Sequence, residues 1–92
     1  MLTFTIPGPL RELANDRHEV RIASSARSVN EALSLLWAEA PAVRDRVITE
    51  RGEVREHINI FVDGESIRDS AGLRTEVRDG AEIVILPAVS GG

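Results

Sequence analysis

The sequence of 92 residues contains no cysteine and no lysine. Without cysteine it has no disulfides, no thiolate nucleophile and no cysteine-ligated zinc, which fits a cytoplasmic protein. Because every basic residue is arginine, the chain has no ε-amine for Schiff-base chemistry or for accepting an isopeptide bond.

A basic excess and a long apolar run are also missing. The 11 basic residues are outnumbered by 15 acidic ones, and phosphate neutralisation, which supplies much of the affinity for nucleic acids, needs a basic surface. The longest apolar run, near residues 83–89, is far below the ~20 residues that cross a bilayer, and no secretory signal is visible. We therefore expect neither a nucleic acid nor a membrane as partner.

Residues for catalysis or metal binding are scarce as well. No Ser–His–Asp order, phosphate-binding glycine loop or dinucleotide motif is present. His18 and His57 are far apart in the sequence and lack the clustered ligands of a metal site. We expect no bound cofactor, no metal and no catalytic residue in this chain.

What is present suits one small domain. Hydrophobic residues make up 42% and charged residues 28% of the chain, as in folded globular proteins. Alternation of apolar and polar residues predicts strands at residues 2–6, 19–23, 57–62, 65–68 and 82–86. Turn signals separate them: Pro7-Gly8-Pro9, Asn15-Asp16-Arg17, Asp63-Gly64 and Asp79-Gly80.

One main helix is predicted between the second and third strands. Ser28, with Glu31 three residues later, forms a capping-box pattern that marks its start. Apolar residues follow at helical spacing, namely Val29, Leu33, Leu36, Trp37 and Ala40. Pro41 ends or kinks the helix, and residues 42–47 have a weaker helical pattern.

This order of elements predicts an α+β fold, a mixed sheet of four to five strands with one main helix packed on one face. The first and last strands are strongly apolar, so we expect them to be central and to pair in parallel. Phe61, Val84 and Leu86 would then form an apolar patch on the opposite face. Such a patch is a candidate partner-docking surface, unless a loop covers it or it is ordinary exposed surface.

The last six residues are the most specific feature, and we expect a domain of residues 1–86 followed by a flexible tail of residues 87–92. Extended, the tail spans roughly 20 Å. Gly91 and Gly92 have no side chain, so the backbone can pass through a channel that side chains would block. A frayed terminus is the alternative interpretation.

Over its whole length the chain resembles the ubiquitin-like sulfur-carrier family of the MoaD/ThiS type, which has the β-grasp fold. The similar segments are residues 10–13, 28–33, 58–64, 79–83 and 86–92. The resemblance implies that a ubiquitin-activating-like adenylyltransferase uses ATP to adenylate the Gly92 carboxylate, which then becomes a thiocarboxylate and donates its sulfur. The residues that would thread the partner's active site are Pro87, Ala88, Val89, Ser90 and Gly91.

The resemblance leaves the acceptor open. The Pro-Ala-Val-Ser ending and the charged loop before Ile58 look most like members that serve cysteine synthesis, with a cysteine synthase-like partner. Small subunits of molybdopterin synthase, which act with a large subunit, more often have Pro-Pro before the valine, and Ala88 departs from that pattern. A ubiquitin-like modifier that forms isopeptides through Gly92, and a binding module with an inert tail, also remain open.

Overall fold

The five strands follow the predicted alternation in the computed structural model, which describes residues 1–87. Their bounds are β1 (Leu2–Thr5), β2 (Glu19–Ile22), β3 (Ile58–Val62), β4 (Glu65–Ser66) and β5 (Glu82–Pro87). In β1 and β3 every second residue is buried and its neighbours are half-exposed. The period-2 pattern therefore predicted which side chains face the core.

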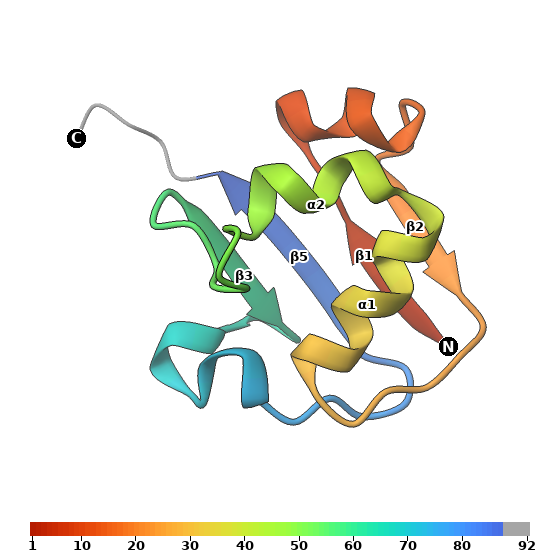
Figure 1. Cartoon of the computed structure of the whole chain (residues 1–92). Helices are drawn as coiled ribbons and strands as arrows, with labels where there is room; N and C mark the ends of the chain where they lie inside the picture. Colours follow the sequence, from red (N-terminus) through yellow and green to blue (C-terminus); the bar gives the residue numbers. More distant parts are fainter. Residues whose placement is uncertain (88–92) are drawn as a thin grey trace.

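The strands form one mixed sheet in the order β2-β1-β5-β3-β4 (Figure 1). β1 and β5 pair in parallel, and the other pairs are antiparallel. The predicted central parallel pair is thus confirmed. Because β1 and β5 run in the same direction, the segment that follows β1 begins at the edge of the sheet where β5 ends.

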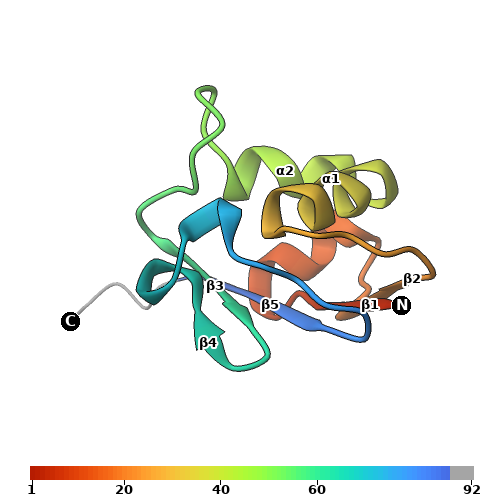
Figure 2. The same ribbon diagram turned by 90° about the horizontal axis from the view of Figure 1, so that it is seen from below.

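Helices α1 (Val29–Glu39) and α2 (Pro41–Val47) lie on one face of this sheet (Figure 2). Ser28 Oγ accepts a hydrogen bond from the Glu31 backbone N–H at 3.2 Å, so the predicted N-cap is confirmed. The segment after Pro41, with its weaker helical pattern, is also a helix, and Pro41 is its first residue. Proline is favoured in the first turn, because an N–H group there has no acceptor within the helix. Trp37 is half-buried and packs against the core from its edge.

The core lies between the helices and the inner face of the sheet. It includes Phe4, Ile60 and Ile83 from the strands and Leu33 and Leu36 from α1. Among the described residues, every buried side chain is apolar, so no polar group there needs a compensating partner. No helix in this part of the chain is long and apolar enough to cross a membrane.

Three segments differ from the prediction. Residues 8–14, which the Pro-Gly-Pro signal marks only as the end of a strand, form a 3₁₀ helix, η1 (Gly8–Ala14), that buries Leu10 and Ala14. The predicted return strand at 65–68 was too long, because η2 (Ile67–Asp69) begins after Ser66, whose Oγ accepts from the Arg68 N–H. Pro87 does not lead out of the sheet; it is the last residue of β5 and pairs with Ile58.

The loop that precedes β5 has one helical turn and two apolar anchors. A single helical turn, η3 (Gly72–Arg74), lies within it. Val77 is buried, and Leu73 packs against the core from its edge. Both side chains therefore anchor a segment that has little regular structure.

The start of the chain is tied to the turn before β5. The Met1 ammonium group donates a hydrogen bond to the Asp79 carboxylate at 2.7 Å, and the Gly80 N–H donates to the Met1 carbonyl. The hydrogen bond and the positive charge of this ammonium group lower the pKa of Asp79. These contacts align the beginnings of β1 and β5.

Arg68 holds the loop that precedes β3. Its Nη2 lies 2.8 Å from the Ile58 carbonyl oxygen, 2.9 Å from that of Glu56 and 3.3 Å from that of Arg55. Arg68→Met should lower the free energy of unfolding by about 1–3 kcal/mol, because the part-buried Ile58 carbonyl loses a charged donor. Urea denaturation measures this loss.

Arg74→Met is the matched control for this prediction. The Arg74 side chain is exposed and makes no hydrogen bond or ion pair to residues 1–87, so its replacement should change the free energy of unfolding by less than about 0.5 kcal/mol. Equal losses in the two variants would show that the contacts of Arg68 contribute nothing beyond its charge.

Candidate functional site

The end of β5 is where the predicted reactive segment begins. Pro87 is half-buried and stands opposite Ile58, the first residue of β3. The C-terminal segment (residues 88–92) therefore starts from the edge of the sheet at which β1 ends and β3 begins. Its residues, including the Gly92 predicted to react, lie outside the described part of the chain; they are Ala88, Val89, Ser90, Gly91 and Gly92.

The outer-face patch (Phe61, Val84 and Leu86) is assembled by the pairing of β3 with β5. Phe61 stands directly opposite Val84, and Leu86 is two residues further along β5, on the same face. Leu86 is 37% exposed and the other two are half-buried. Because both helices cover the opposite face (Figure 2), the geometry of the predicted patch is as expected.

Polar residues border this patch. Thr5 of β1 pairs with Val84, Ser66 of β4 pairs with Phe61, and Asn59 pairs with Leu86. Glu82, two residues before Val84 on β5, adds one exposed carboxylate on the same face. An apolar centre inside a polar rim is the usual composition of a protein–protein contact surface. The patch also ends one residue before Pro87, next to the start of the C-terminal segment.

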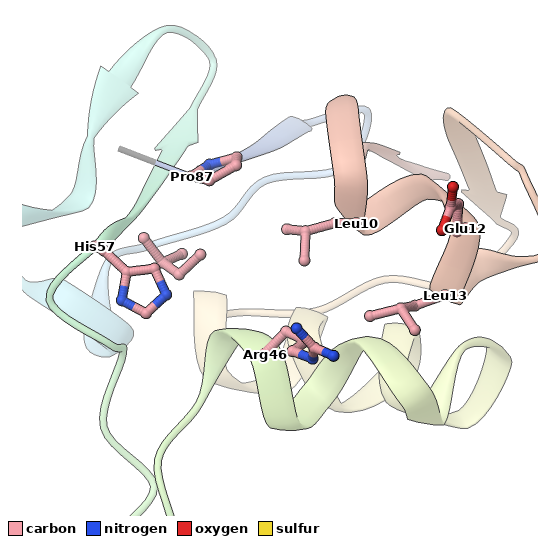
Figure 3. A pocket seen from close by; sticks show the side chains of 7 residues that line it. Leu10, Glu12, Leu13, Arg46, His57 and Pro87 are labelled. Atoms are coloured by element: carbon pink, nitrogen blue, oxygen red, sulfur yellow. The ribbon is translucent and has the colours of Figure 1, made fainter. Parts of the chain in front are cut away.

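A cleft of about 390 Å³, which no pattern in the sequence predicts, opens on the other side of Pro87. We call it the terminal cleft; its lining residues are Leu10, Glu12, Leu13, Arg46, His57, Ile58 and Pro87. Figure 3 shows Leu10 and Leu13 on η1 facing Arg46 on α2, with His57 and Pro87 at one end. It could not be predicted from the sequence, because its wall is the unexpected helix η1.

The charged groups of the terminal cleft have no partner within the described chain. Neither Arg46 nor Glu12 takes part in the ion pairs of residues 1–87, and neither side chain makes a hydrogen bond there. Glu12 lies at the opposite end of the cleft from Pro87 (Figure 3). Both histidines are exposed, and residues 1–87 contain no cluster of three metal-ligating side chains.

Comparison with known proteins identifies the family. The model of the ThiS family matches residues 4–92. The chain belongs to the ThiS family. It is 32% identical over 93 residues to the sulfur carrier protein CysO of Mycobacterium tuberculosis, covering 99% of this chain and 98% of that one.

Two further similarities agree with this assignment. The chain is 36% identical over 84 residues to small archaeal modifier protein 1 of Haloferax volcanii, covering 90% of this chain and 91% of that one. A solved structure of the BexX/CysO complex of Amycolatopsis orientalis superposes with a TM-score of 0.89 and 32% identity, covering 100% of each chain. The ThiS-family chain thus has the ubiquitin-like β-grasp fold of sulfur carriers and related modifiers.

Proposed function

We propose that this ThiS-family protein carries sulfur as a thiocarboxylate on Gly92. The carboxylate first attacks the α-phosphate of ATP on a separate adenylyltransferase, which gives an acyl-adenylate and releases pyrophosphate. A sulfur nucleophile then displaces AMP, and the resulting C-terminal –C(O)S⁻ group donates its sulfur to an acceptor enzyme. The single observation that carries this proposal is the family match, which extends through residue 92.

The arrangement of the described residues supports this role. β5, from which the C-terminal segment starts, is hydrogen-bonded on both sides, by β1 and by β3. A central strand is held more firmly than an edge strand, so the point where the segment begins is fixed relative to the outer-face patch. A partner that docks on Phe61, Val84 and Leu86 would then find Gly92 no further from Pro87 than the roughly 17 Å that five extended residues span.

For the acceptor we propose an enzyme of cysteine synthesis. This chain is similar over nearly its whole length to the Mycobacterium tuberculosis sulfur carrier protein CysO. The ending Pro87-Ala88-Val89-Ser90 is the sequence feature that favours the carriers serving cysteine synthesis. The molybdopterin synthase small subunit is the other sulfur-transfer role, and Ala88 weighs against it.

Intact-mass spectrometry tests the proposal. The chain is incubated with ATP, its cognate adenylyltransferase and a sulfide donor, and we expect a mass gain equal to the exchange of one oxygen for one sulfur. Fragmentation should place this change at Gly92. Omission of ATP is the control, and an unchanged mass in the complete reaction would contradict the proposal.

A modifier role is the second candidate, favoured by the similarity to small archaeal modifier protein 1. The same acyl-adenylate can transfer Gly92 to a lysine amine of a target protein. Because this chain contains no lysine, it cannot form lysine-linked polymers of itself. Isopeptides ending in Gly91-Gly92 on target lysines, found by peptide mass spectrometry, would establish this role.

A further inference from the structure

The terminal cleft is a second surface beside the start of the C-terminal segment, on the side of β5 opposite the outer-face patch. Four apolar side chains line it: Leu10 and Leu13 from η1, Ile58, which begins β3, and Pro87, which ends β5. The parallel pairing of β1 with β5 places η1 beside Pro87, so the position of the cleft follows from the topology.

We propose that the terminal cleft receives the rim of the enzyme channel that takes up Gly92. The inference rests on the proposed function, in which residues 88–92 enter a channel of the partner enzyme. The rim of any such channel must come close to Pro87, and Pro87 is part of the cleft wall. The fitting partner element is an apolar side chain that enters between η1 and α2, with a neighbouring carboxylate that pairs with Arg46.

The charge of Arg46 gives the reason for the carboxylate. The chain as a whole is acidic, with a net charge of −4, yet this guanidinium group points into the space between α2 and η1 (Figure 3) without an acidic partner in residues 1–87. A guanidinium group pairs with carboxylates through two parallel hydrogen bonds. Glu12 is set apart at the far end of the cleft, so it leaves the end near Pro87 open to an incoming acid.

The chain's own end is a poorer occupant of the same cleft. Beyond Pro87 only Val89 has an apolar side chain larger than a methyl group, so a folded-back segment would bury little apolar surface against Leu10 and Leu13. Fixing five residues, two of them glycine, would also cost backbone entropy with little apolar burial in return.

The test compares Arg46→Glu with Arg44→Glu in pyrophosphate exchange by the cognate adenylyltransferase. Both residues lie on α2 in its last turn, so the two variants change the net charge equally. Arg44 pairs with Asp45 at 3.4 Å and does not line the cleft. For Arg46→Glu we expect the KM for the chain to rise at least about tenfold with little change in kcat. For Arg44→Glu we expect less than about a twofold change.

Leu13→Gln tests the apolar part of the cleft in the same assay. The Leu13 side chain is half-buried, so the variant should fold, which circular dichroism verifies, and KM should again rise. Equal KM values for wild type, Arg46→Glu and Leu13→Gln would overturn the inference and leave the proposed function standing. A wild-type chain that gains no sulfur would instead overturn both.

Experiments distinguish the partner enzyme from two other occupants of the cleft, the chain's own end and a second copy of the chain. Methyl NMR shifts of Leu10 and Leu13 should be the same in the whole chain and in a variant without residues 88–92; a change would show that the chain's own end fills the cleft and would overturn the inference. Sedimentation should give a monomer. A dimer that Arg46→Glu dissociates would assign the cleft to a second copy and would equally overturn it.

Discussion

Deleting Gly91 and Gly92 should abolish thiocarboxylate formation and leave the free energy of unfolding unchanged. The shortened chain ends in a carboxylate on Ser90, which falls short of the reacting position by two residues, or roughly 7 Å. Misplacement of a reacting group by only about 1 Å can cost about 100-fold in rate. Intact-mass analysis after reaction with ATP, adenylyltransferase and sulfide measures the product, and urea denaturation measures the stability.

The stability half of this prediction follows from where the core lies. All fully buried side chains of the described residues fall between Leu2 and Ile85, and β5 ends at Pro87, so the deletion removes no described core contact. A deletion variant that still gains sulfur would rule out Gly92 as the reactive residue.

Gly91→Val separates the need for a free carboxylate from the need for a narrow backbone. This variant keeps the length of the chain and the Gly92 carboxylate but adds a branched side chain next to it. If the segment enters a channel that admits only glycine backbone, kcat/KM for activation should fall by about 100-fold. Ala38→Val is the control, because it adds a branched side chain at an exposed position of α1, away from the C-terminal segment, and its activity should be near that of the wild type.

The parts of the fold predicted well are those in which a local pattern and the tertiary structure agree. Alternation placed Phe4, Ile60 and Ile83 on one face of the sheet, and burial on that face fixes the register, since a slip by one residue would expose the whole apolar set. The N-cap at Ser28 is a local hydrogen bond with its own sequence signature. Such elements need little information from distant residues.

The errors lie where tertiary contacts decide the local structure. Residues 8–14 form η1 because Leu10 and Ala14 find space beside α2, and no periodic pattern over seven residues specifies that. Pro87 stays in β5 because β3 begins with Ile58, its partner. The terminal cleft depends on both of these features, so a candidate site defined by η1 and Pro87 was beyond reach from the sequence.

The outer-face patch was predictable for the opposite reason. Once the core face of β3 and β5 is known, Phe61, Val84 and Leu86 must lie on the other face, and the pairing of β3 with β5 brings them together. Alternation does not predict whether these three side chains bind a partner. A partner's contact with the patch has to be measured, and the exposed position of Leu86 makes this measurement possible without disturbing the core.

Leu86→Asp should raise the KM for activation by the adenylyltransferase at least about tenfold, equivalent to roughly 1.4 kcal/mol of binding free energy. At 37% exposed, Leu86 is the most accessible member of the patch, so the folded chain tolerates a charge there. In a docked complex the same charge would be desolvated against an apolar surface without a partner, which is costly. Titration of the chain in pyrophosphate exchange gives KM and kcat.

Ala38→Asp is the matched control for charge, because Ala38 is exposed on α1, on the face of the sheet away from the patch. It adds the same negative charge, and it should leave KM within about twofold, since a surface charge outside an interface acts only through screened long-range forces. If both variants raise KM equally, general repulsion by an acidic partner explains the two effects, and the patch is not a docking surface. Unchanged KM in both variants would exclude docking on the patch as well. If only Leu86→Asp weakens binding, Phe61→Ala should weaken it too, because the two residues flank Val84 on the same face and would contact the same partner surface.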